Sequence, residues 1–206
     1  MKGGLSQFTL NGTTVSVRDS AGTTRAAPLF FVSPGQVNHL IPAGTAAGPA
    51  TITITAFDGT TSATTTVQVT AIAPGVFAAD ATGKGLVAAQ VLRVKPDGSS
   101  RYEPVVEFER LSGKPNAIPI DLGAESDQVF LIVYGTGFRH RGSLSAATAT
   151  VGGVNANVLY AGAQGVLAGL DQANLRLPRS LIGRGEVEVV LTVDRKPANT
   201  VKVSIK

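Results

Sequence analysis

The sequence contains no cysteine and no tryptophan, and its only methionine is Met1. Without cysteine the chain can form no disulfide and offers no thiolate for catalysis or for zinc and iron–sulfur sites. No apolar run approaches the roughly 20 residues that cross a bilayer as a helix, so no membrane span is expected. The absence of tryptophan and the presence of only three tyrosines weigh against a flat aromatic platform that stacks on sugars.

Charged residues are also scarce, at 16% of the 206 residues, while hydrophobic residues make up 43%. This balance is typical of a globular domain and not of a disordered chain. The net charge is +4, but the basic residues are spread along the sequence. A surface that follows nucleic-acid phosphates normally concentrates lysine and arginine, so nucleic acid is not the expected partner.

Helix signals are almost absent, and Thr, Val, Ile and Gly are frequent. Turn signals recur every eight to twelve residues or so, roughly the spacing of a β-sandwich or barrel. Residues 51–55 and 64–70 alternate in polarity on either side of Asp58-Gly59, which predicts a hairpin. Residues 128–134 form the most apolar strand and predict a central one. The expected fold class is all-β.

An internal repeat is the strongest feature of the sequence. Residues 36–42 (Gln-Val-Asn-His-Leu-Ile-Pro) return as residues 172–178 (Gln-Ala-Asn-Leu-Arg-Leu-Pro), at an offset of 136 residues (172 minus 36). The same offset overlays residues 14–70 on residues 150–206. Such a repeat predicts two related β modules in tandem.

The overlay fails at one point. Ile52 and Ile54 fall on Glu188 and Val190, so the apolar positions are out of phase. A shift of one residue turns every side chain of a strand to the other face. We therefore expect a one-residue slip, at a bulge or a loop, somewhere in the range 42–58.

Three segments are expected: a first β module over 1–74, a connecting β-hairpin segment over 75–117, and a second β module over 118–206. The hairpin, at residues 86–110, has no counterpart in the first copy. The first module is also expected to lack a strand corresponding to 128–134. We expect the resulting open edge to be filled by the hairpin, by upstream sequence or by a neighbouring chain, for example in a homodimer.

Several short motifs carry a family resemblance. Gly-Thr-Gly-Phe at 135–138 after the central strand, Gln-Ala-Asn-Leu-Arg-Leu-Pro at 172–178 and Gly-Glu-Val-Glu-Val at 185–189 are motifs of the second copy. With them the second copy, over 118–206, resembles the TIG (IPT) immunoglobulin-like domain, which implies an immunoglobulin-like fold for both modules. Nearly the whole chain is similar to the uncharacterised C-terminal domain of large secreted acidobacterial (Solibacter-type) proteins. The motifs that carry this similarity are Ser-Pro-Gly-Gln-Val-Asn at 33–38, Ala-Pro-Gly-Val-Phe at 73–77, Tyr-Gly-Thr-Gly at 134–137 and Gly-Leu-Asp-Gln at 169–172. The resemblance implies a β-sandwich, an extracellular or cell-surface location in bacteria, and no catalytic residues.

The expected function is therefore a non-catalytic structural or interaction module that serves adhesion, anchoring or spacing in a secreted multidomain protein. Its expected partner is a protein or a glycan at the cell surface. A carbohydrate-binding module of a surface enzyme and a DNA-contacting TIG protein remain open as alternatives, because the fold alone does not select a function.

Repeated amides are the first candidate ligand-binding residues. Gln36 and Asn38 recur as Gln172 and Asn174, and side-chain amides at these positions could bind a polar ligand such as a glycan. The alternative is structural, with the amides bonding backbone groups of the preceding loop. Their presence in both copies favours the structural interpretation.

The two histidines offer little for catalysis. His39 is in line with Val37 and Ile41 on the expected inner face, as a core or interface residue. His140 lies close to Ser143, and the pair is the basis of a further alternative, an atypical small serine hydrolase. The sequence lacks the Gly-x-Ser-x-Gly turn that would hold such a nucleophile.

Three acidic residues precede the central strand: Asp121, Glu125 and Asp127. Carboxylates at this density could bind Ca²⁺ in an extracellular setting, although the spacing is not that of an EF-hand loop. Otherwise they are solvated loop charges. No other cofactor is expected.

Overall fold

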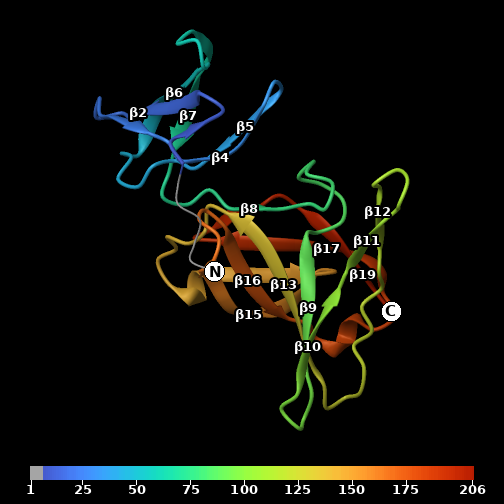
Figure 1. The fold of residues 1–206 in the computed structure, drawn as a ribbon. Helices are drawn as coiled ribbons and strands as arrows, with labels where there is room; N and C mark the ends of the chain where they lie inside the picture. Colours follow the sequence, from blue (N-terminus) through green and yellow to red (C-terminus); the bar gives the residue numbers. More distant parts are fainter. Residues whose placement is uncertain (1–6) are drawn as a thin grey trace. The chain divides into compact units, whose positions relative to one another are not determined.

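The computed structural model describes residues 7–206, and nearly all of its regular structure is antiparallel β-strand (Figure 1). The expected all-β class is confirmed. The helices within this range are two short 3₁₀ helices, η1 (Leu144–Ala146) and η2 (Arg179–Leu181). Neither has the length and apolarity that a membrane-spanning helix requires.

The chain divides into two compact units, residues 1–71 and 72–206. In the first unit, one sheet has the strand order β1-β2-β6-β7 with β3 paired to β2, and a second sheet consists of β4 and β5. A small core of Val15, Val17, Ala27, Leu29, Ala50 and Ile52 lies in this unit. The strands are β1 (Thr9–Leu10), β2 (Thr13–Arg18), β3 (Thr24–Ala26), β4 (Leu29–Ser33), β5 (Gln36–His39), β6 (Gly48–Thr55) and β7 (Thr61–Val69).

The hairpin predicted around Asp58-Gly59 is confirmed by the pairing of β6 with β7. The N–H of Ala56 donates to the carbonyl of Thr60 at 2.8 Å across the turn. Gly59 takes a φ of +82°, which a residue without a Cβ adopts at no steric cost.

In the second unit, a large sheet runs in the order β10-β9-β13-β16-β15-β14-β17-β18, with β8 paired to β13 and β19 paired to β17. The predicted central strand is confirmed as β13, which lies between β9 and β16. A separate pair is formed by β11 and β12. The strands are β8 (Gly75–Val76), β9 (Ala89–Val94), β10 (Ser100–Pro104), β11 (Val106–Phe108), β12 (Pro115–Ala117), β13 (Gln128–Thr136), β14 (Ala147–Val151), β15 (Val154–Ala163), β16 (Asp171–Arg176), β17 (Gly185–Val193), β18 (Lys196–Pro197) and β19 (Val201–Ile205).

Strand β15 belongs to both halves of this sheet. Its first residues pair with β14, and its later residues pair with β16 beyond an irregularity between Val158 and Tyr160. One long strand thus joins the β14-β17-β19 half to the β10-β9-β13-β16 half. The core between them includes Leu131, Phe138, Leu175 and Leu191, all fully buried.

The hairpin expected over 86–110 forms in part. Strands β9 and β10 pair across the turn at 95–99, but β10 ends at Pro104, and β11 leaves to pair with β12. A proline has no N–H with which to continue a ladder. The hairpin pairs with β13 of its own unit through β9.

Two of the short motifs contact each other. Strand β8, within Ala-Pro-Gly-Val-Phe at 73–77, pairs with the end of β13 at Gly135 and Thr136. The N–H of Ala73 also donates to the carbonyl of Gly137 at 3.0 Å. A Cβ built on Gly135 would lie 2.1 Å from the carbonyl oxygen of Gly75, so this approach requires glycine.

Candidate binding face

The sheet containing β13 has one face in the core and one face turned away from it. Val129, Leu131 and Val133 belong to the core cluster. Because side chains alternate along a strand, Phe130 and Tyr134 of β13 point to the opposite face. Residues directly opposite each other in an antiparallel ladder share a face, so the strand pairings identify the other members.

We call this surface the outer face. Its first row across the strands consists of Tyr102, Leu92, Phe130, Arg176 and Asn157. The second row consists of Gln90, Ile132, Asn174 and Tyr160, and the third consists of Tyr134, Gln172 and Gly162. All three tyrosines of the sequence therefore lie on one sheet surface, on three different strands.

The tyrosines differ in exposure. Tyr102 is 64% exposed and Tyr160 is 38% exposed, whereas Tyr134 is half-buried. The hydroxyl of Tyr134 donates to the side-chain oxygen of Gln90 at 3.4 Å. Burial, together with the nearby Tyr102, raises the pKa of Tyr134 above its ordinary value of 10.0. The face thus offers accessible aromatic rings next to amide groups.

The repeated amides form a ladder along each strand. Nε2 of Gln172 donates to Oδ1 of Asn174 at 2.8 Å, and Nε2 of Gln36 donates to Oδ1 of Asn38 at 2.7 Å. The amides therefore bond each other and not backbone groups of the preceding loop. The NH₂ group of Asn174 and the carbonyl oxygen of Gln172 are not used in this bond and remain on the outer face for a ligand.

Two arginines flank the amides. Arg176 occupies the first row, and Arg141 lies over Gly162, where an added Cβ would meet its guanidinium at 3.1 Å. Within residues 7–206 neither arginine forms an ion pair, and Nε of Arg141 is buried without a hydrogen-bond partner. The outer face therefore carries two arginine side chains that form no ion pair within the described residues, although Glu125 and Asp127 line the same cavity as Arg176.

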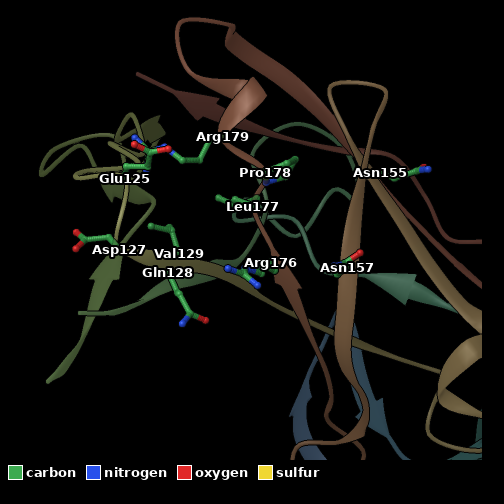
Figure 2. Close-up of a pocket in the computed structure, with 10 residues that line it drawn as sticks. All are labelled: Glu125, Asp127, Gln128, Val129, Asn155, Asn157, Arg176, Leu177, Pro178 and Arg179. Atoms are coloured by element: carbon green, nitrogen blue, oxygen red, sulfur yellow. The ribbon is translucent and has the colours of Figure 1, made fainter. Parts of the chain in front are cut away.

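A polar cavity of about 290 Å³ adjoins the outer face at the end of the first row. Gln128, Asn157 and Arg176 line it and belong to the strands of the outer face, and Figure 2 shows the Arg176 side chain lying between Gln128 and Asn157. Glu125, Asp127, Asn155 and Arg179 complete its polar lining.

The three carboxylates considered for Ca²⁺ are engaged separately. Asp121 accepts from the N–H of Gly123 at 2.8 Å and from Nζ of Lys206 at 3.0 Å, and these two contacts lower its pKa. Asp127 pairs with Arg93 at 3.3 Å, and Glu125 and Asp127 point in different directions in Figure 2. No group of three potential ligands arranged to hold a metal occurs in the described chain. The geometry gives no support to a cation site here.

The histidines are far from a catalytic arrangement. Oγ of Ser143 contacts Oγ of Ser145 at 2.8 Å and accepts from the N–H of Ala146, so it caps η1 and does not bond His140, which is exposed. His39 lies on β5, partly buried, and burial lowers its pKa below the ordinary 6.5.

The candidate face contains two of the residues singled out from the sequence, Gln172 and Asn174, and adds several others. Its tyrosines and arginines were missed because the sequence shows them on separate segments. Alternation within each strand indicates which residues share a face of that strand. The register between strands, which brings Tyr102, Tyr134 and Tyr160 to the same surface, is not visible in the sequence.

Comparison of the chain with protein-family models, with curated proteins and with solved structures gave no match.

Proposed function

We propose that the chain is a non-catalytic adhesion module, built from two related immunoglobulin-like units of the TIG type, that binds an acidic polysaccharide through the outer face of its second unit. The observation that carries this proposal is the presence of all three tyrosines on the outer face, beside the amides of Gln172 and Asn174. The cell-surface location and the place in a secreted bacterial protein belong to the same proposal and rest on the family resemblance.

The strand order supports two related units. In the first unit β2 pairs with β3 and β6, and in the second β14 pairs with β15 and β17. Strand β4 pairs with β5 as the later part of β15 pairs with β16. A single strand, β15, thus takes the places of β3 and β4.

The register supports the same relationship. Thr14 pairs with Thr55, and Thr150, which matches Thr14 at the offset of 136, pairs with Val190. Thr55 and Val190 are related by an offset of 135 residues (190 minus 55). The difference of one residue agrees with the slip expected in the range 42–58, and it brings Ile54 onto Val189, whose side chain is buried.

The chemistry of the outer face favours an acidic sugar polymer. Tyrosine rings on a sheet surface stack on the C–H faces of sugar rings and bury apolar area at low entropic cost. Side-chain amides donate to and accept from hydroxyl groups. Unpaired Arg141 and Arg176 add charge-assisted hydrogen bonds to carboxylate or sulfate groups.

The test measures binding of the full chain to polygalacturonate and alginate, with neutral dextran and an oligothymidylate as comparison ligands. We expect binding to the acidic polysaccharides that weakens with salt, and a loss of about ten-fold in affinity for Tyr102→Ala and for Tyr160→Ala, since truncation of an aromatic anchor typically costs at least about 1 kcal/mol. The control is Phe57→Ala, which removes an aromatic side chain that is 82% exposed in the first unit.

Absence of polysaccharide binding, or an equal loss in Phe57→Ala, would overturn the proposal. Tighter binding to the oligothymidylate would replace the glycan by a single-stranded nucleic acid, whose bases also stack on aromatic side chains. Ester hydrolysis that disappears in Ser143→Ala or His140→Ala would contradict a non-catalytic role.

A further inference from the structure

Strand β5 has an unpaired edge. Within residues 7–206 it pairs with β4 alone, whereas β16, the strand that carries the same Gln-x-Asn sequence, lies between β15 and β13. Within the described residues of the first unit, no strand therefore lies beside β5 in the position that β13 occupies beside β16.

The direction of the backbone groups can be read from two hydrogen bonds. The N–H of Leu40 donates to the carbonyl of Pro28 at 2.9 Å, next to β4. Because N–H groups alternate in direction along a strand, those of Val37, His39 and Ile41 point to the unpaired edge. In the second unit, the N–H of Leu177, the residue that matches Ile41, donates to the carbonyl of Val129 of β13 at 2.9 Å.

The side chains at positions 37, 39 and 41 are also less buried than those at the matching positions of the second unit. Ala173 and Leu175 are 0% exposed and Leu177 is 5% exposed beside β13, in the same sheet. Their counterparts Val37, His39 and Ile41 are only partly buried. Within the described chain, partly buried His39 stands where β16 carries the fully buried Leu175, so the first unit has less apolar cover on this side.

The sequence of β5 does nothing to block pairing. Edge strands commonly carry charges or proline that prevent association with other strands. Strand β10, at the edge of the large sheet, contains Arg101, Glu103 and Pro104. In contrast, β5 reads Gln-Val-Asn-His and has no lysine, arginine, carboxylate or proline.

We propose that the first unit binds an extended segment of another polypeptide as an additional antiparallel strand along β5. The segment has the chemistry of β13: it is uncharged, and apolar side chains at alternate positions, like Val129, Leu131 and Val133, cover Val37, His39 and Ile41. The main chain supplies affinity and the alternate side chains supply selectivity, as in other cases of strand addition. This protein-binding edge is separate from the polysaccharide-binding face of the second unit.

The test uses a fluorescent peptide with the sequence of residues 128–136, flanked by lysines for solubility, and the full chain. We expect saturable binding by anisotropy and slower hydrogen exchange at the amides of Val37, His39 and Ile41. Val37→Pro removes one N–H from the unpaired edge and leaves the β4 ladder in place, so it should weaken binding at least ten-fold. Val37→Ala, the matched control, keeps the N–H and should bind within about three-fold of the original chain.

The exchange measurement on the unaltered chain tests the proposal even if Val37→Pro fails to fold. Unprotected amides at 37, 39 and 41, or equal binding by the proline and alanine variants, would overturn it. Dimerisation that Val37→Pro abolishes would also overturn it, in favour of a second copy as the occupant. Tyr102→Ala should bind the peptide normally, so failure of polysaccharide binding and failure of strand addition are distinguishable.

Discussion

Arg93 and Glu103 form a two-point ion pair between β9 and β10, with Nε at 2.6 Å from Oε1 and an Nη at 3.1 Å from Oε2. Arg93 is 3% exposed and also bonds Asp127 and the carbonyl of Asp121. The pKa of Arg93 is raised and that of Glu103 is lowered, each chiefly by the hydrogen bond to the other. The pair ties the β9–β10 hairpin to the segment that leads into β13.

Removal of Glu103 should be costly because it leaves a buried guanidinium without its main partner. We expect Glu103→Ala to reduce the free energy of unfolding by about 3 kcal/mol in urea titrations. The control is Glu186→Ala, which breaks the exposed pair with Lys202 and should cost less than about 1 kcal/mol. Similar losses of unfolding free energy in the two variants would show that the buried ion pair stabilises the fold no more than the exposed pair does.

Acid should destabilise the chain through His39. Burial lowers its pKa in the folded state below the ordinary 6.5. At a pH above 6.5 the imidazole is neutral in both the folded and the unfolded chain. As the pH falls below 6.5, the unfolded chain takes up the proton first, so the free energy of unfolding falls until the pH reaches the pKa of the folded state.

His39→Leu gives β5 a leucine at the position that matches Leu175 of β16. We expect this variant to show no loss of stability from titration of this residue as the pH falls. The measurement compares urea midpoints at about pH 7.5 and about pH 5. His140→Leu controls for the loss of an imidazole as such. If the fall persists unchanged in His39→Leu, then burial of this histidine is not its cause.

Gly135→Ala should weaken the attachment of β8 to β13. The new Cβ would lie 2.1 Å from the carbonyl oxygen of Gly75 and 3.0 Å from the ring of Phe138, and the backbone carbonyl leaves no easy relief. We expect a loss of about 3 kcal/mol, at the upper end for overpacking, measured by thermal and urea unfolding. Gly35→Ala meets nothing within 4 Å and should be nearly neutral, so equal effects would contradict the close approach.

Gly162→Ala should alter binding more than stability. The Cβ would come within 3.1 Å of the Arg141 guanidinium and of the Tyr160 hydroxyl, which donates to the carbonyl of Ala163, so both groups need to shift by only a few tenths of an ångström. Because these groups move at little cost, we expect a change of less than about 1 kcal/mol in unfolding free energy. Affinity for the acidic polysaccharide should nevertheless fall several-fold, and unchanged affinity would remove Arg141 and Tyr160 from the proposed contact.

Much of the fold was predictable from local signals. Alternation predicted β6 and β7 around Asp58-Gly59, and the apolar run at 128–134 predicted β13 as a central strand. The end of β10 at Pro104 has a local signal, because proline has no N–H for the ladder. The pairing of β11 with β12 and of the β9–β10 hairpin with β13 depends on the register between segments, which alternation does not reveal.

The candidate site was harder to predict for the same reason. Gln172 and Asn174 were predicted as candidate ligand-binding residues because they repeat Gln36 and Asn38. The small number of tyrosines argued against sugar binding, but stacking on a sugar depends on whether the tyrosines lie on the same face of the sheet. Tyr102, Tyr134 and Tyr160 come from three segments, and only the register of β10, β9, β13, β16 and β15 brings them to one surface.

The continuity of β15 has a mechanical consequence. In the second unit one strand hydrogen-bonds to both halves of the sheet, so neither half can separate without breaking its hydrogen bonds to that shared strand. In the first unit β3 and β4 divide that role, with the buried Pro28 between them. Under tension the first unit should therefore yield in stages and the second as a single block, so a pulled chain would lengthen first at its amino-terminal unit.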